Sequence, residues 1–124
     1  MIQTAGAVIT NPCGSVMRSL LVAVCELGVE DIMVIGHHGC GMCGMRADRL
    51  LAKMAERSIR EEAIDTLRAS GVDVNAWLSG FHHVEDAVRE TVRVIRQHPL
   101  MPTDVRVHGF VIDPETGKLD ALMP

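Results

Sequence analysis

Imidazole and thiol side chains gather in one short segment of the sequence. His37, His38, Cys40 and Cys43 lie within seven residues and are interleaved with glycines. Imidazole nitrogen and thiolate sulfur are donors that zinc prefers, and donors separated by two residues can chelate one ion. Cys40 and Cys43 also form a Cys-x-x-Cys pair, a spacing that suits thiol–disulfide exchange. The segment predicts a zinc or redox site, and the alternative is a Gly-rich turn whose cysteines are merely small and buried.

A predicted strand positions this segment. Residues 32–35 are an apolar run that ends in Gly36, and a helical pattern begins soon after the His/Cys segment. In open α/β sheets, ligands bind beyond the carboxyl ends of the strands. The His/Cys segment occupies that position, which favours a metal or redox role over a simple turn.

The residues around this loop resemble a known family. Val34 to Gly41 resembles the second zinc motif of the β-class carbonic anhydrases, a Gly-His-x-x-Cys-Gly loop after a strand. Upstream, Ala5-Gly6 resembles that family's Arg-Asn-Ala-Gly segment, with Gln3-Thr4 in the first two places. Downstream, Gly109 to Leu119 is similar to the family's last strand and closing turn. The resemblance covers nearly the whole chain.

The resemblance implies zinc-dependent, reversible hydration of carbon dioxide to bicarbonate, a zinc lyase activity. By motif match, His37 and Cys40 are the Zn²⁺ ligands. The family's first motif, Cys-x-Asp-x-Arg, precedes the Ala-Gly segment, and the sequence from Met1 onward has no match to it. The third ligand and the catalytic Asp–Arg pair are therefore unassigned. Cys43 is the first substitute ligand to consider, followed by Cys13 and His38.

The absent motif carries a structural expectation. In the family it lies on an interior strand, so the resemblance implies a sheet that lacks one strand of the family core. Three outcomes are possible. The remaining strands could pair with one another across the gap, or a partner chain could fill it. Alternatively, the sequence is a shortened version of a longer protein. An impaired or absent activity of this shortened form follows as an expectation.

Composition limits the remaining possibilities. A length of 124 residues suits one α/β domain spanning residues 1–124. The net charge of −4 argues against a nucleic-acid partner. Neither an apolar run of membrane-spanning length nor a secretory signal is visible, so we expect a cytoplasmic protein without a membrane partner. Four cysteines in such a chain fit thiols and metal better than disulfides.

The alternation of strand and helix patterns predicts a mostly parallel sheet flanked by helices. Besides residues 32–35, we expect strands at 7–10, 105–112 and 118–122. Helices are expected at 14–27, at 47–55, from a capping box of Ser58 and Glu61 to about residue 70, and at 84–97. Trp77 and Phe81 are expected to pack against the body of the protein.

The helix expected at 14–27 predicts a partner. Its interior, Val16 to Cys25, carries only Arg18 and Ser19 as polar residues. A helix that is apolar nearly all round must be covered on more than one side, so we expect a homodimer or a higher homo-oligomer. Arg18 fits an ion pair better than a bicarbonate site.

Two further functions stay open. The absent first motif suggests a non-catalytic zinc-binding or assembly module of the same fold. The Cys40–Cys43 pair suggests a thiol redox protein. His82 and His83 precede the helix at 84–97 and could shuttle protons or simply be solvated or capping side chains.

Overall fold

The computed structural model describes residues 1–123, which divide into two compact units. The first unit contains Met1–Cys40 and the chain from His83 onward, and the second contains Gly41–His82. The elements of the first unit are η1 (Ala5–Ala7), α1 (Ser15–Leu27), β1 (Asp31–His37), α5 (Val84–Gln97), β2 (Arg106–Ile112) and β3 (Leu119–Leu122). Those of the second are α2 (Ala47–Glu56), α3 (Glu61–Ala69) and α4 (Val74–Leu78).

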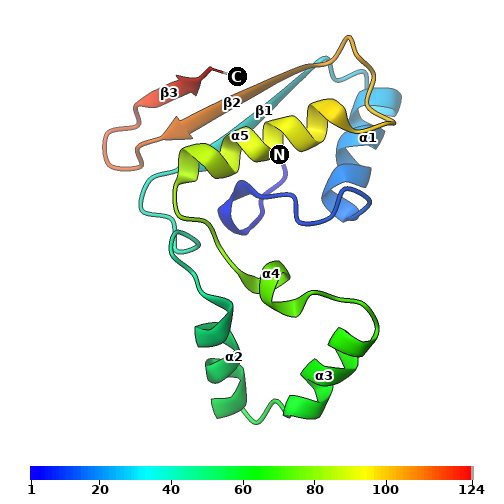
Figure 1. Ribbon diagram of the computed structural model, residues 1–124. Helices are drawn as coiled ribbons and strands as arrows, with labels where there is room; N and C mark the ends of the chain where they lie inside the picture. The colour runs from blue at the N-terminus through cyan, green and yellow to red at the C-terminus, as the bar shows by residue number, and fades with distance from the viewer. Residues whose placement is uncertain (124) are drawn as a thin grey trace. The chain divides into compact units, whose positions relative to one another are not determined.

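The first unit is built on a three-stranded sheet in the order β1-β2-β3 (Figure 1). β1 and β2 are parallel, with Asp31 opposite Arg106 and His37 opposite Ile112. β3 pairs antiparallel to β2 after a turn in which the Gly117 N–H donates to the Asp113 carbonyl at 2.7 Å. The predicted α/β class is therefore present, with parallel pairing at β1 and an antiparallel edge at β3.

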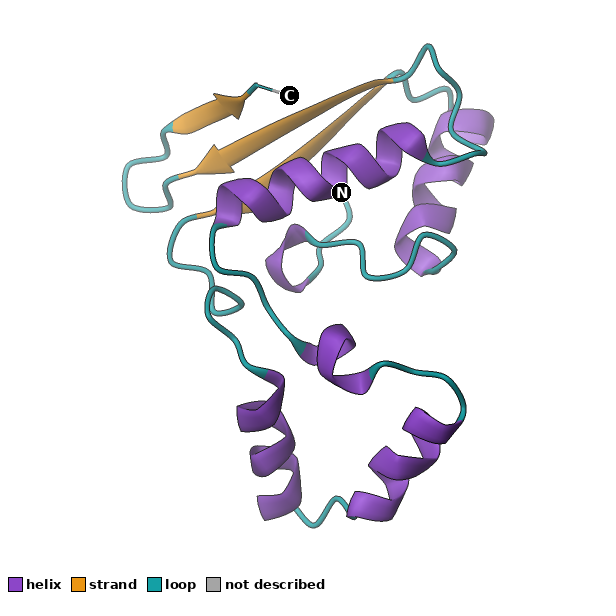
Figure 2. Cartoon of the chain, in the orientation of Figure 1, coloured by secondary structure: helices purple, strands orange, loops and turns teal. Residues whose placement is uncertain are grey.

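Helix α5 covers one face of this sheet (Figure 2). Its buried side chains include Val88, Val92 and Ile95, and they meet the inward residues of the strands. Burial along β1 alternates with every residue, as expected for a strand with one covered face. The inward-facing positions of the strands are Ile32, Val34, Gly36, Val107, Gly109 and Val111.

The other face of β1 remains apolar and exposed. Met33 and Ile35 point away from the α5 side by strand alternation and are 52% and 43% exposed. Sheets made only of parallel strands are almost always covered on both faces, and β1 and β2 form the parallel part of this sheet. Helix α1 adds a second under-covered surface, because Met17 is its one buried residue.

In the second unit, α2 and α3 each contact α4. Loop 42–45 is joined to residues 80–81 by three backbone hydrogen bonds of 2.7 to 3.1 Å. Gly80 is required at this junction, because a Cβ there would lie 1.9 Å from the Met42 carbonyl oxygen. α4 was not expected from the sequence, and the Asp73 carboxylate caps it by accepting from the Ala76 N–H at 3.1 Å.

Three local predictions were wrong. Residues 7–10 do not form a strand; instead, Ala5–Ala7 form a 3-10 turn in which Gly6 and Ala7 have φ values of 77° and 55°. Ser58 does not cap α3, because it has a φ of 68° and the helix begins at Glu61. Trp77, expected to be packed, is 54% exposed.

Candidate functional site

β1 carries His37 to the carboxyl end of the parallel pair, where the candidate loop begins. His37 is opposite Ile112, and the His38 N–H donates to the Ile112 carbonyl at 3.1 Å. The backbone ladder with β2 therefore continues one residue past β1. The first two residues of the loop are held by the sheet, which is the rigid support that a binding site needs.

Gly36 allows α5 to pack directly against the strand just before His37. A Cβ at position 36 would lie 2.7 Å from Cγ2 of both Val84 and Val88. Real Cβ atoms do not approach carbon so closely, so a larger residue would displace α5 or the strand end. The glycine that opens the Gly-His-x-x-Cys motif thus has a packing role in this protein.

The His37 ring is oriented by a hydrogen bond to its neighbour's backbone. Nδ1 lies 2.9 Å from the His38 carbonyl oxygen, which can only accept, so Nδ1 carries the proton and donates. In the neutral ring, Nε2 then presents its lone pair. Histidines that bind metals commonly make this kind of bond through their second nitrogen.

Cys40 follows in the same loop, after a left-handed turn at Gly39 with a φ of 71°. Cys40 is partly buried, whereas the other three cysteines are exposed. All four are free thiols. His37 and Cys40 both belong to the first unit. The loop therefore offers one imidazole nitrogen and one thiol, donor types that fit zinc.

The other candidate ligands are placed differently. Cys43 lies in the second unit, where its Sγ donates to the His82 carbonyl at 3.1 Å. Its use as a substitute ligand stays a prediction. His83 is the N-cap residue of α5 without a side-chain capping bond, so the capping alternative for this residue was wrong.

Within residues 1–123, no group of three or more His, Cys, Asp or Glu side chains is arranged to hold a metal ion. Zinc in proteins is almost always four-coordinate, and catalytic sites use three protein ligands with one open position. The donor chemistry of His37 and Cys40 fits zinc and would fill two of these positions. The third ligand is not assembled from the described part of the chain.

A polar cluster that the sequence did not reveal lies at the other end of the parallel pair. Arg106 binds the Asp31 carboxylate through Nε and Nη2 at 2.7 and 2.6 Å, and His108 Nε2 lies 3.2 Å from the same carboxylate. The hydrogen bond from Arg106, followed by that from His108, holds the pKa of Asp31 well below its usual value. Only the register that pairs Asp31 with Arg106 brings these residues together.

Comparison with known proteins connects the loop to a family. The carbonic anhydrase family model matches residues 1–119. The chain belongs to the β-carbonic anhydrase family. Two Bacillus subtilis relatives are the proteins named "Putative carbonic anhydrase YvdA", 47% identical, and "Putative carbonic anhydrase YtiB", 50% identical, each over 123 residues. These alignments cover 99% of this chain but 62% and 66% of the relatives.

Solved β-carbonic anhydrases share the fold. The crystal structure of isoform I from Trichomonas vaginalis matches with a TM-score of 0.87 and 34% identity, over 98% of this chain and 66% of that one. An apo carbon disulfide hydrolase matches with a TM-score of 0.78 at 24% identity, which shows a common fold. These matches confirm the predicted family and α/β class. No helix among residues 1–123 has the length and apolar character needed to cross a membrane.

Proposed function

We propose that this protein is a zinc-dependent carbonic anhydrase that interconverts carbon dioxide and bicarbonate, with His37 and Cys40 as two of its metal ligands. The observation that carries the proposal is the 2.9 Å bond from His37 Nδ1 to the His38 carbonyl. It leaves Nε2 as the metal donor in a loop whose sequence matches the family's second zinc motif. Family membership supplies the reaction class.

Each ligand has a defined state in this proposal. His37 would bind through Nε2 as the neutral ring, while Nδ1 keeps its proton and donates it in the hydrogen bond to the His38 carbonyl. Cys40 binds as the thiolate, so metal binding releases its proton. With zinc held there, a bound water molecule would have a pKa of about 7, so hydroxide would be available at neutral pH as the nucleophile for carbon dioxide.

The remaining donors lie outside the two residues of the loop. By the family resemblance, they come from a Cys-x-Asp-x-Arg motif, which residues 1–124 do not contain. The chain spans about two thirds of the length of its Bacillus subtilis relatives. We therefore expect full activity only when this motif is present as well. Cys43 remains a candidate substitute for the missing ligand.

We also propose that the protein is a homo-oligomer. Met33 and Ile35 form an exposed apolar patch on a sheet face that is normally covered in parallel sheets. α1 likewise buries one residue although it is apolar on nearly all sides. A second copy would remove both surfaces from water.

The experiment combines zinc content with a carbon dioxide hydration assay. Purified protein, H37A, C40S and the matched control C25S are analysed for zinc, since Cys25 is an exposed thiol outside the loop. We expect zinc in the wild type and in C25S, and loss of zinc in H37A and C40S. A metal-free wild type, or zinc retained in both loop variants, contradicts the ligand assignment.

Stopped-flow hydration then separates the catalytic and non-catalytic alternatives. Zinc-dependent turnover supports the carbonic anhydrase proposal, whereas bound zinc without turnover supports the non-catalytic module. A reversible Cys40–Cys43 disulfide in place of zinc would support the redox alternative.

A further inference from the structure

A groove lies between α5 and the β2–β3 pair, away from the His/Cys loop. Its volume is about 610 Å³, which is within the size range of small-molecule pockets. Arg96 lines it and bonds the carbonyl of Val107. None of the residues that line the groove belongs to the His/Cys loop. The groove and the metal loop are therefore separate sites in the same unit.

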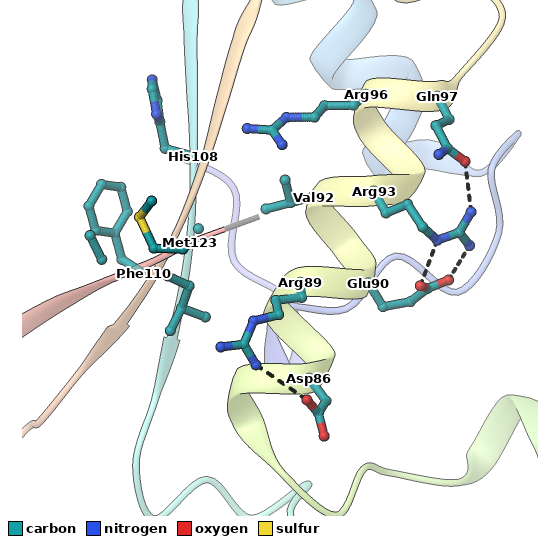
Figure 3. A pocket seen from close by; sticks show the side chains of 13 residues that line it. Asp86, Arg89, Glu90, Val92, Arg93, Arg96, Gln97, His108, Phe110 and Met123 are labelled. Atoms are coloured by element: carbon teal, nitrogen blue, oxygen red, sulfur yellow. Dashed lines mark hydrogen bonds and ion pairs between the residues drawn. The ribbon is translucent and has the colours of Figure 1, made fainter.

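The floor of the groove is apolar. Val92 of α5 points toward the strands, and Gly109 and Leu122 are direct partners across β2 and β3 (Figure 3). A Cβ at Gly109 would lie 3.0 Å from Val88, 3.2 Å from Val92 and 3.8 Å from Leu122. The glycine thus brings the helix close to the sheet, and Leu122 supplies an aliphatic surface beside it.

Three arginines on α5 line the groove, but they are oriented differently. Arg89 and Arg96 reach from the helix toward the strands on either side of Val92 (Figure 3). Arg93 points the other way, where three of its nitrogens bind Glu90 and Gln97. Two guanidinium groups therefore border the apolar floor, and the third is held by Glu90 and Gln97.

Of these two arginines, Arg96 is better placed to bind an anion. Its Nη2 donates to the buried Val107 carbonyl, which fixes the guanidinium, and this is its one hydrogen bond within residues 1–123. A guanidinium has five N–H donors, so several stay available. Arg89 is paired with Asp86 at 3.4 Å, and that carboxylate would repel a second anion at its end of the groove.

We propose that this groove binds a small aliphatic carboxylate. The carboxylate group pairs with Arg96, and the aliphatic chain lies over Val92, Gly109 and Leu122 toward Arg89. Guanidinium groups match the geometry of a carboxylate through parallel N–H donors, which a neutral ligand cannot use. A single negative charge with an apolar body fits one available arginine beside an apolar floor.

The test is an NMR titration of the isotopically labelled protein with sodium hexanoate. We expect shifts of the backbone amides of α5, β2 and β3 that saturate, and an affinity that rises from butanoate to hexanoate by up to about fourfold for each added methylene. Hexanol lacks the charge and sodium bicarbonate lacks the chain, so neither should give these shifts at the same concentration.

Two variants distinguish the arginines. R96Q should weaken hexanoate binding by about tenfold or more, since a hydrogen bond to a charged group is lost. R93Q is the control and should weaken binding much less than R96Q, because the guanidinium of Arg93 is already bound to Glu90 and Gln97 and is turned away from the strands. Equal binding by R96Q and wild type, equal loss in R93Q, or an affinity that is independent of chain length would overturn the proposal. These outcomes do not depend on zinc.

Discussion

Replacing Gly36 by alanine tests how α5 fixes the metal loop. The new Cβ would lie 2.7 Å from Cγ2 of both Val84 and Val88, whereas carbon atoms prefer about 3.5–4.0 Å. Neither valine can easily turn away, because valine in a helix has one strongly preferred rotamer. Overpacking costs about 1–3 kcal/mol, and with two methyl groups affected we expect about 2–3 kcal/mol for G36A.

The assay is urea unfolding monitored by circular dichroism, with G41A as the matched control. Gly41 lies in the same loop, and a Cβ there would meet no atom within 4 Å. We expect G41A to change the free energy of unfolding by less than about 0.5 kcal/mol. V88A removes one of the two opposing methyl groups, so G36A/V88A should be more stable than the sum of the single changes predicts, by about 1 kcal/mol.

The result that would refute this reasoning is a G36A protein as stable as G41A. It would mean that Cγ2 of Val84 and of Val88 lie farther than 2.7 Å from the position of a Cβ at residue 36. A strictly additive double variant would show instead that the loss arises elsewhere than at Val88.

Two other predictions concern the ends of elements in the first unit. The hydrogen bond from Arg106 lowers the pKa of Asp31, so this carboxylate stabilises the fold above pH about 4 and the stabilisation is lost as the pH falls toward the lower folded pKa. D31N should therefore flatten the acid limb of a stability–pH series, and an unchanged limb would count against the pairing. His98 accepts from the Leu100 N–H at Nδ1 and donates from Nε2 to the Pro12 carbonyl at 2.8 Å. H98A should cost about 1–3 kcal/mol and speed hydrogen exchange of the Leu100 amide, whereas H98N, which keeps an acceptor, should lose less; equal exchange in all three proteins would contradict this.

Elements with local signals were predictable from the sequence. α1 ends where Gly28 adopts a left-handed φ of 71°, as a helix-terminating glycine predicts. The edge strand β3 follows the turn chemistry of Asp113 to Gly117. α5 showed its buried face at helical spacing and ends before Pro99. In each case the residues that decide the structure lie within a few positions of it.

Features that depend on distant partners were not predictable. Residues 7–10 have a β-type composition but form no strand; η1 ends at Ala7, whose carbonyl accepts a hydrogen bond from Thr91 of α5 at 3.1 Å. The ion pair of Asp31 with Arg106 needs the register of β1 against β2. For the candidate site, His37 and Cys40 could be proposed from the motif, whereas the orientation of the His37 ring depends on where the loop backbone places the His38 carbonyl.

X-ray absorption at the zinc edge shows which side chains bind the metal. For zinc-loaded protein, we predict an imidazole nitrogen at about 2.0–2.1 Å and a sulfur at about 2.3 Å from the metal. After reconstitution with excess zinc, H37A should show weaker imidazole scattering and C40S weaker sulfur scattering, while C25S should match the wild type. A spectrum with neither scatterer, or one that stays the same in H37A and C40S, would contradict the claim that these two residues bind one zinc ion.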